Sequence, residues 1–303
     1  MNHGFDGNQW WIEYNQSNRA PGNIREESLL RAKELSANHD NLILSFSGGL
    51  DSQCMLLSFL EQGLAVDTAF MHLPGYNDNE YEQVKLCNHR WGIDTQIVSF
   101  DPLSVKEEID HWSNVLDIPN KNSILHRKFV SLLPTNATVV QNLGPPSIYI
   151  NPKTGNTYCF TGYYSLEISR RRAFDSLDRK GKTLFWDYDP EFLLSTLDDE
   201  IFKAGLTSYR YIDHVTGNKN SIDFDRWDYF IKPFMYGKYW GKDLIYFPKY
   251  SGFEKLDFIK QDIDYKLRNN SVVVPYEEFV NGLKTGAKRY YQNHNPNLRL
   301  SES

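Results

Sequence analysis

Short runs of apolar and β-branched residues alternate with longer segments of helical periodicity in the first half of the chain. We predict strands where an apolar run is short, and helices where apolar positions recur every three or four residues. The predicted strands are 42–46, 66–73 and 95–100, and the predicted helices are 24–37, 52–62, 79–91 and 105–116. From residue 40 the order is βαβαβα, which favours a parallel sheet with right-handed crossovers and helices on both faces.

The second half of the chain has a different pattern. Segments 147–160 and 208–224 each carry two β-favouring arms around a Thr-Gly-Asn turn, and we predict both as hairpins. Helices are predicted over 164–177 and 190–204. After Phe224, aromatic residues and lysines are interrupted by Gly and Pro, so no regular element is predicted there.

The predicted architecture is a doubly wound α/β fold with an aromatic-rich α+β elaboration at its C-terminal end. We divide the chain into an N-terminal extension and helix (1–37), an α/β core (38–180) and a C-terminal substrate or interaction region (181–303).

The junction LILSFSGGLDS, at 42–52, places two glycines, several hydroxyls and one carboxylate between a predicted strand and a predicted helix. A glycine turn lets the backbone approach a ligand closely, and the first N–H groups of a helix have no partner within it. Ser47 and Ser52 add hydroxyl donors and the helix dipole adds partial positive charge, so the turn suits pyrophosphate or triphosphate. Phosphate would repel Asp51 unless a cation lies between them, which indicates Mg²⁺ or a role at the helix start.

The P-loop of ATPases requires G-x-x-x-x-G-K-[ST], and this junction has no lysine. Its pattern, S-G-G-x-D-S after an apolar strand, closely resembles the PP-loop ATP pyrophosphatase superfamily of adenine nucleotide α-hydrolase-like proteins. That superfamily includes the C-terminal domain of asparagine synthetase, NAD synthetase and phosphoadenylylsulfate reductases. The resemblance implies a HUP-like sheet, ATP and Mg²⁺ as cofactors, and Asp51 as metal ligand. The ATP-binding residues that it implies at the junction are Ser45, Ser47, Gly48, Gly49, Leu50, Asp51 and Ser52.

Three further segments extend the resemblance. MHLPGYNDNE, at 71–80, corresponds to the region after the second strand on which members hold adenosine. TGYYSLEISRRR, at 161–172, is similar to a reductase-like pattern of glycine, then Glu, then Arg three residues on. IKPFMYGKYW, at 231–240, resembles a Lys-Pro-hydrophobic segment of several branches. These matches add Met71, His72, Gly162, Glu167 and Arg170 to the implied ATP site, and Lys232 to Asp51 as a catalytic residue.

Several of these residues also have a simpler interpretation. A lone histidine at a strand end, such as His72, is more often structural. Arg170, Arg171 and Arg172 point about 100° apart on a helix, so we expect one to face a ligand and the others to face water. Lys238 and Lys242 are alternatives to Lys232 for neutralising pyrophosphate, although lysines among aromatic residues often only extend to water.

The resemblance implies an AMP-forming ligase. A substrate oxygen attacks the α-phosphorus, pyrophosphate leaves into the turn, and an amine, ammonia or a sulfur nucleophile displaces AMP. Valine at Gly48 or Gly49 should abolish nucleotide binding, because it would occupy the phosphate position and resist a positive φ. A phosphoadenylylsulfate reductase-like or tRNA-modifying protein and a non-catalytic nucleotide-binding module stay open as alternatives.

Charge narrows the choice of partners. The chain has 33 Lys and Arg against 39 Asp and Glu, for a net charge of -6. This balance argues against a protein that mainly coats a phosphate backbone, and the sequence gives no strong evidence for a DNA partner. A small-molecule substrate, tRNA and a homodimer stay open as partners.

There is no run of 18 apolar residues and no apolar signal-peptide centre near the N-terminus, so we expect a cytoplasmic protein without a membrane span.

The positions of the cysteines argue against a metal cluster, a catalytic thiol and an N-terminal glutaminase. Cys54, Cys87 and Cys159 form no C-x-x-C pair, so we expect buried thiols, with neither a metal cluster nor a catalytic thiol. Residue 2 is Asn where an N-terminal glutaminase has its cysteine, so a self-contained glutamine-dependent amidotransferase is not expected.

Overall fold

The computed structural model describes most of the chain, and the account below is confined to the described residues. These are residues 2–5, 9–116, 118, 121–142, 148–150, 157–162, 166–178, 182–186, 189–203, 232–247, 256 and 271–292. The predicted hairpin at 208–224 therefore lies outside the description.

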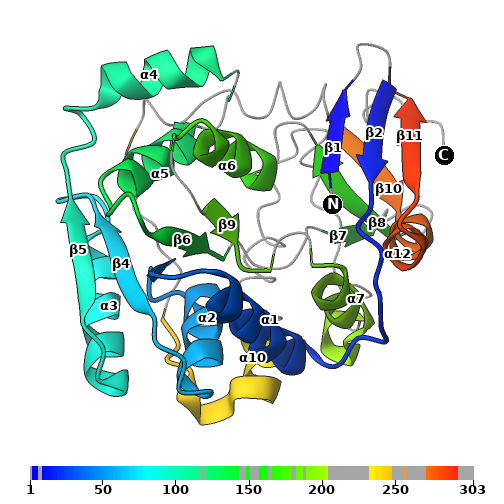
Figure 1. The fold of residues 1–303 in the computed structure, drawn as a ribbon, viewed down its shortest axis with the longest axis horizontal. Helices are drawn as coiled ribbons and strands as arrows, with labels where there is room; N and C mark the ends of the chain where they lie inside the picture. The colour runs from blue at the N-terminus through cyan, green and yellow to red at the C-terminus, as the bar shows by residue number, and fades with distance from the viewer. Residues whose placement is uncertain are drawn as a thin grey trace.

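A five-stranded sheet forms the centre of the molecule, in the order β5–β4–β3–β6–β9 (Figure 1). Every neighbouring pair in it is parallel. The chain first winds outward from β3 to β4 and β5, and then returns to the other side of β3 for β6 and β9, so the winding direction reverses between β3 and β6. The strands are β3 (Leu42–Ser45), β4 (Asp67–His72), β5 (Thr95–Ser99), β6 (Thr138–Gln141) and β9 (Lys182–Leu184).

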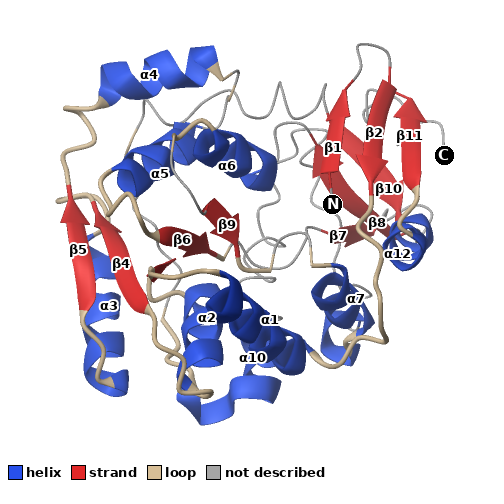
Figure 2. Cartoon of the chain, in the orientation of Figure 1, coloured by secondary structure: helices blue, strands red, loops and turns tan. Residues whose placement is uncertain are grey.

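Helices cover both faces of this sheet, which confirms the doubly wound α/β prediction (Figure 2). Alternate residues of β3 point to opposite faces, so Leu42 and Leu44 join one buried cluster while Ile43 joins the other. The first cluster packs against α1 (Ile24–Asn38), α2 (Leu50–Leu60) and α3 (Asp78–Trp91). The second packs against α4 (Lys106–Val115), α5 (Lys121–Ser131) and α6 (Leu166–Asp175).

Antiparallel strands form two smaller sheets, of which the first combines strands from both ends of the chain and the second combines strands from its middle and its C-terminal part. One has the order β1–β2–β11 and the other the order β10–β8–β7. The β7–β8 pair confirms the hairpin predicted over 147–160. The elements concerned are β1 (Asn2–Phe5), β2 (Gln9–Glu13), β7 (Ile148–Ile150), β8 (Thr157–Gly162), β10 (Ser271–Pro275) and β11 (Lys288–Gln292), with α7 (Pro190–Asp198) and α12 (Tyr276–Thr285) beside them.

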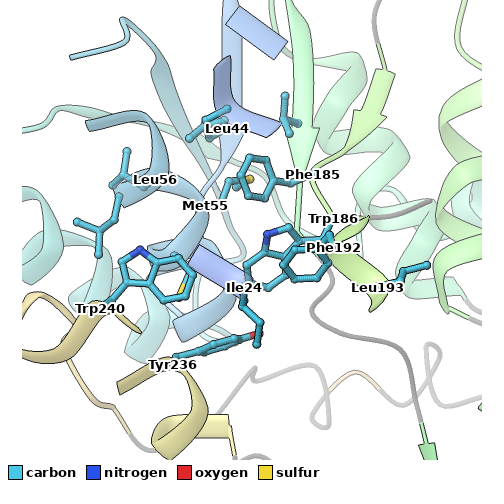
Figure 3. Packing of buried hydrophobic residues seen from close by; sticks show 14 of the residues in the cluster. Ile24, Leu44, Met55, Leu56, Phe185, Trp186, Phe192, Leu193, Tyr236 and Trp240 are labelled. Carbon is cyan, nitrogen blue, oxygen red and sulfur yellow. The ribbon is translucent and has the colours of Figure 1, made fainter. Parts of the chain in front are cut away.

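A helix occupies the region after residue 224 where we predicted no regular element. This helix, α10 (Lys232–Trp240), is followed by a short 3₁₀ turn, η2 (Gly241–Asp243). Met235, Tyr236 and Trp240 are buried on the side of α10 that faces the first cluster, as Figure 3 shows for the two aromatic rings. Burial of this face stabilises the helix despite Gly237, because packing outweighs the roughly 1 kcal/mol penalty of a helical glycine.

In the described ranges, no helix has both the length and the apolar character needed to cross a membrane.

Candidate active site at the switch point of the sheet

The glycine turn lies at the carboxyl end of β3 and leads directly into α2. Gly48 has a φ of 73°, a left-handed value that side chains disfavour. A Cβ at Gly48 would lie 3.2 Å from Gln83 Cβ and 3.3 Å from the backbone nitrogen of Val84. The expected positive φ is therefore confirmed at Gly48, and the turn also approaches α3 so closely that a Cβ there would require a shift of a few tenths of an ångström.

Gly49 differs from this expectation. It is the N-cap of α2 with φ −70° and ψ 160°, which is extended backbone open to any residue. A Cβ there would meet only Ser47 Oγ, at 3.4 Å, an ordinary contact. The positive-φ argument for Gly49 is therefore wrong. Because Gly49 has no side chain, the N-cap position accepts no side-chain hydrogen bond from the first turn of α2. The N–H groups of that turn therefore need another acceptor, such as a bound anion.

The hydroxyls of the turn lie together at the start of α2. Ser47 Oγ and Ser52 Oγ are 3.4 Å apart, and Ser52 Oγ donates to the Gly49 carbonyl at 2.8 Å. The Gly49 N–H donates to Ser47 Oγ over a long 3.4 Å. Backbone donors, hydroxyls and the positive end of the α2 dipole thus converge at one point, which is the arrangement that binds a phosphate group.

Asp51 is held by two side chains from α10. Its Oδ2 forms an ion pair with Lys232 Nζ, and its Oδ1 accepts a hydrogen bond of 2.6 Å from the Tyr236 hydroxyl. Lys232 lies 181 residues beyond Asp51 in the chain. The side chain of Asp51 is 21% exposed and that of Lys232 is 11% exposed, so the pair lies at the edge of the core with access to solvent. The structure thus brings the two predicted catalytic residues into direct contact.

The other two lysines lie elsewhere. Lys238 forms ion pairs with Asp199 and Glu200, and its hydrogen bond to Glu200, followed by those to Tyr239 and Asp199, raises the pKa of the Lys238 ammonium. Lys242 is exposed in η2.

The end of β6 supplies two residues that sequence reasoning missed. Asn142 Nδ2 donates to the Asp51 carbonyl oxygen at 2.8 Å, and Gln141 Nε2 donates to Ser45 Oγ at 3.3 Å. Both stand at the end of the apolar run of β6, a strand that we did not predict. Recognising that strand would have placed their amides at the carboxyl end of the sheet.

Arg170 reaches this region through Gln141. Its guanidinium is buried and donates to Gln141 Oε1 at 2.6 Å. Gln141 Nε2 also donates to His126 Nδ1 at 2.9 Å. Burial, with the Arg170 charge as a second cause, holds the pKa of His126 well below its usual value, so the imidazole is neutral. Arg171 lies on the outside of α6, where its side chain is 43% exposed.

Gln53 connects the turn to the segment after α10. Its buried side chain donates to the Gly48 carbonyl at 2.6 Å and to the Ile245 carbonyl at 2.8 Å. The Ile245 N–H in turn donates to Gln53 Oε1 at 2.8 Å. Since this amide uses both its donor and acceptor groups, it fixes the turn and the Ile245 backbone relative to each other.

Two of the remaining predicted residues lie on β4, the strand that pairs with β3. His72 ends β4, forms a 2.9 Å hydrogen bond with Asp78 and stacks on Tyr81 with ring centroids 4.6 Å apart. Met71, also in β4, is buried, and its carbonyl accepts a hydrogen bond from Asn77.

Two more predicted residues, Gly162 and Glu167, lie on β8 and on α6. Gly162 ends β8 and pairs with Ser271 of β10, outside the central sheet. Glu167 lies in α6, and its side chain is outside the description.

Two of the three cysteines are buried free thiols, as expected. Burial raises the pKa of Cys87 to about 12, and burial together with the charge of Asp51 raises the pKa of Cys54 well above its usual value. Both thiols therefore stay protonated at neutral pH and are poor nucleophiles. The side chain of Cys159 lies outside the description.

No protein-family model and no curated protein matches the sequence. Three solved structures are similar to it in part. An NH3-dependent NAD synthetase from Campylobacter jejuni in complex with nitrate is 13% identical, with a TM-score of 0.34 over 75% of this chain and 97% of that one. A glutamine-dependent NAD+ synthetase from Acinetobacter baumannii in complex with ADP is 16% identical, with a TM-score of 0.31 over 41% of this chain. An NMN synthetase from Francisella tularensis is 17% identical, with a TM-score of 0.30 over 39% of this chain.

This chain spans only 27% of the Acinetobacter protein and 54% of the Francisella protein. Likenesses this distant carry no argument about chemistry, so the interpretation of the site rests on its own residues.

The residues around Asp51 fit a Mg²⁺ ion that arrives with a nucleotide. Among the described residues, no three His, Cys, Asp or Glu side chains gather into a metal site. Mg²⁺ in nucleotide sites typically takes one or two carboxylates and completes its shell with phosphate oxygens and water. The Asp51 carboxylate has lone pairs beyond the two that Lys232 and Tyr236 use. Lys232 would have to turn away, because an ammonium group and Mg²⁺ repel each other at the same oxygen.

Proposed function

We propose that this chain binds ATP with Mg²⁺ at the 47–52 turn and acts as an adenylating enzyme of the PP-loop type. The observation that carries the proposal is the meeting of Asp51 and Lys232 beside a glycine turn at the switch point between β3 and β6. In open parallel sheets, ligands bind outside the carboxyl ends of the strands at this point. The turn supplies hydrogen-bond donors for an anion. Lys232 supplies a positive charge that can turn from Asp51 to the bound anion.

The same arrangement favours release of pyrophosphate over release of orthophosphate. The β and γ phosphates would lie against the Ser47 and Ser52 hydroxyls and the first N–H groups of α2, with Lys232 as counter-charge. The α-phosphorus would then be left open to an acceptor on the outer side. Bound Mg²⁺ would supply further charge neutralisation for the departing group.

The proposed reaction has two steps. A carboxylate or amide-like carbonyl oxygen of the substrate forms a bond to the α-phosphorus, while the bond from that phosphorus to the bridging oxygen breaks and pyrophosphate leaves. An amine, ammonia or a sulfur nucleophile then bonds to the activated carbon and AMP leaves. The enzyme contributes position and charge stabilisation in both steps.

Product analysis tests this proposal. Isothermal titration calorimetry should first show that ATP binds in the presence of Mg²⁺. Incubation of [α-³²P]ATP with a metabolite pool should then yield AMP and pyrophosphate. ADP and orthophosphate as stoichiometric products, or no ATP binding, would refute the assignment.

Replacing Asp51 tests the role of its carboxylate. Asp51→Asn should lower the rate by about 100-fold, in the range found when one charge-stabilising group is removed from an active site. Asp67→Asn, at an exposed carboxylate at the start of β4, is the matched control and should leave the rate unchanged.

A further inference from the structure

Two chemically different groups of α10 hold Asp51. Lys232 and Tyr236 are four residues apart, so they lie on the same face of the helix and reach the carboxylate from one side. Lys232 bonds one oxygen with a charged ammonium group, and Tyr236 bonds the other with a neutral hydroxyl at 2.6 Å.

The two groups also differ in the side chains that carry them. The Tyr236 side chain is fully buried, with its ring centroid 5.6 Å from that of Trp186 and 6.0 Å from that of Trp240 (Figure 3). Close packing on both sides fixes the position of its hydroxyl. The Lys232 ammonium group is a point charge on a flexible four-carbon stem, so it can reorient while its backbone stays in α10.

A nucleotide would compete for only one of these partners. The phosphates of ATP attract the Lys232 ammonium group and bring a cation to Asp51, so charge drives Lys232 from the carboxylate to the phosphates. The Tyr236 hydroxyl has no net charge and stays where the packing of its ring places it. When Lys232 leaves, Tyr236 therefore still orients Asp51.

Resting on the proposed function, we propose that Tyr236 is the positioning residue for Asp51: its hydroxyl holds the carboxylate in the orientation that receives Mg²⁺ while Lys232 moves to the phosphates. The structure carries a matched control on the same helix. The hydroxyl of Tyr239 also donates to a carboxylate, that of Asp199, at 2.5 Å.

The test is the dependence of ATP affinity on Mg²⁺, measured by calorimetry on the full chain with and without the ion. Tyr236→Phe should reduce the Mg²⁺-dependent gain in affinity about tenfold, equivalent to about 1.4 kcal/mol, and leave affinity for Mg²⁺-free ATP unchanged. Tyr239→Phe should leave both values at wild type. A purely structural role of Tyr236 would instead lower both affinities together, and that result would overturn the proposal.

Two further variants test the inference by other routes, and the second of them does not depend on the stability of Tyr236→Phe. In an Asp51→Asn background, Tyr236→Phe should have no further effect, because its action passes through the carboxylate. Lys232→Met should weaken ATP binding but preserve the gain from Mg²⁺, and loss of that gain would assign the positioning role to Lys232 instead. Failure of the wild-type chain to bind ATP would overturn the proposed function, whereas normal Mg²⁺ dependence in Tyr236→Phe would overturn this inference alone.

Discussion

A comparison of Gly48→Ala with Gly63→Ala tests whether the 47–52 turn has a role in phosphate binding that an ordinary glycine turn lacks. Gly48 and Gly63 both have left-handed backbone, with φ of 73° and 63°. An alanine in this conformation costs about 1–2 kcal/mol at either position. A Cβ at Gly63 meets nothing within 4 Å, whereas at Gly48 it lies 3.2 Å from Gln83 Cβ and 3.3 Å from the Val84 nitrogen. Gly63→Ala therefore reproduces the backbone strain without the steric contact.

The additional contact at Gly48 cannot relax easily. Val84 N belongs to the backbone of α3, and the Gly48 carbonyl is held from the other side by Gln53 at 2.6 Å. Overpacking of this kind costs about 1–3 kcal/mol, so we expect Gly48→Ala to lose about 2–5 kcal/mol of unfolding free energy and Gly63→Ala about 1–2 kcal/mol. The turn should also move by a few tenths of an ångström relative to α3, which displaces its phosphate donors.

Urea unfolding and ATP calorimetry measure these two effects separately. We expect Gly48→Ala to bind ATP at least about tenfold more weakly, a loss of about 1.4 kcal/mol, and Gly63→Ala to bind it as wild type does. Equal ATP affinity in the two folded variants would refute the view that the turn holds the phosphates.

Two further predictions concern buried titratable groups. The thiols of Cys54 and Cys87 should not react with Ellman's reagent at pH 8 in the native protein, because burial raises the pKa of each; labelling of either thiol as fast as in urea would contradict this. The pKa of His126 is lowered by folding, so below about pH 6.5 the unfolded state binds a proton that the native state excludes, and stability should fall as the pH drops. His126→Gln, which can still accept the Gln141 hydrogen bond, should reduce the loss of urea stability between pH 7 and 5.5, and an unchanged loss would show that His126 is not the group responsible.

Local pattern was sufficient for the elements between residues 24 and 116. The predicted strands and helices between residues 24 and 116 all form, with ends shifted by no more than about two residues, because each has a clear period and a clear boundary. The helix over Ile24–Asn38, for example, begins at a capping box between Asn23 and Glu26. The glycine turn could also be identified from sequence, since its residue types and spacing are local.

Tertiary structure decided which residues meet at the turn. Nothing in the spacing of Lys232 and Tyr236 relates them to Asp51, because α10 reaches the carboxylate only after its apolar face packs on α1 and α2. Gln141 and Asn142 likewise reach the turn only because β6 pairs with β3. Periodicity along a chain records which side chains are buried, but contacts between distant elements depend on how their buried faces dock, and that is a property of the whole core.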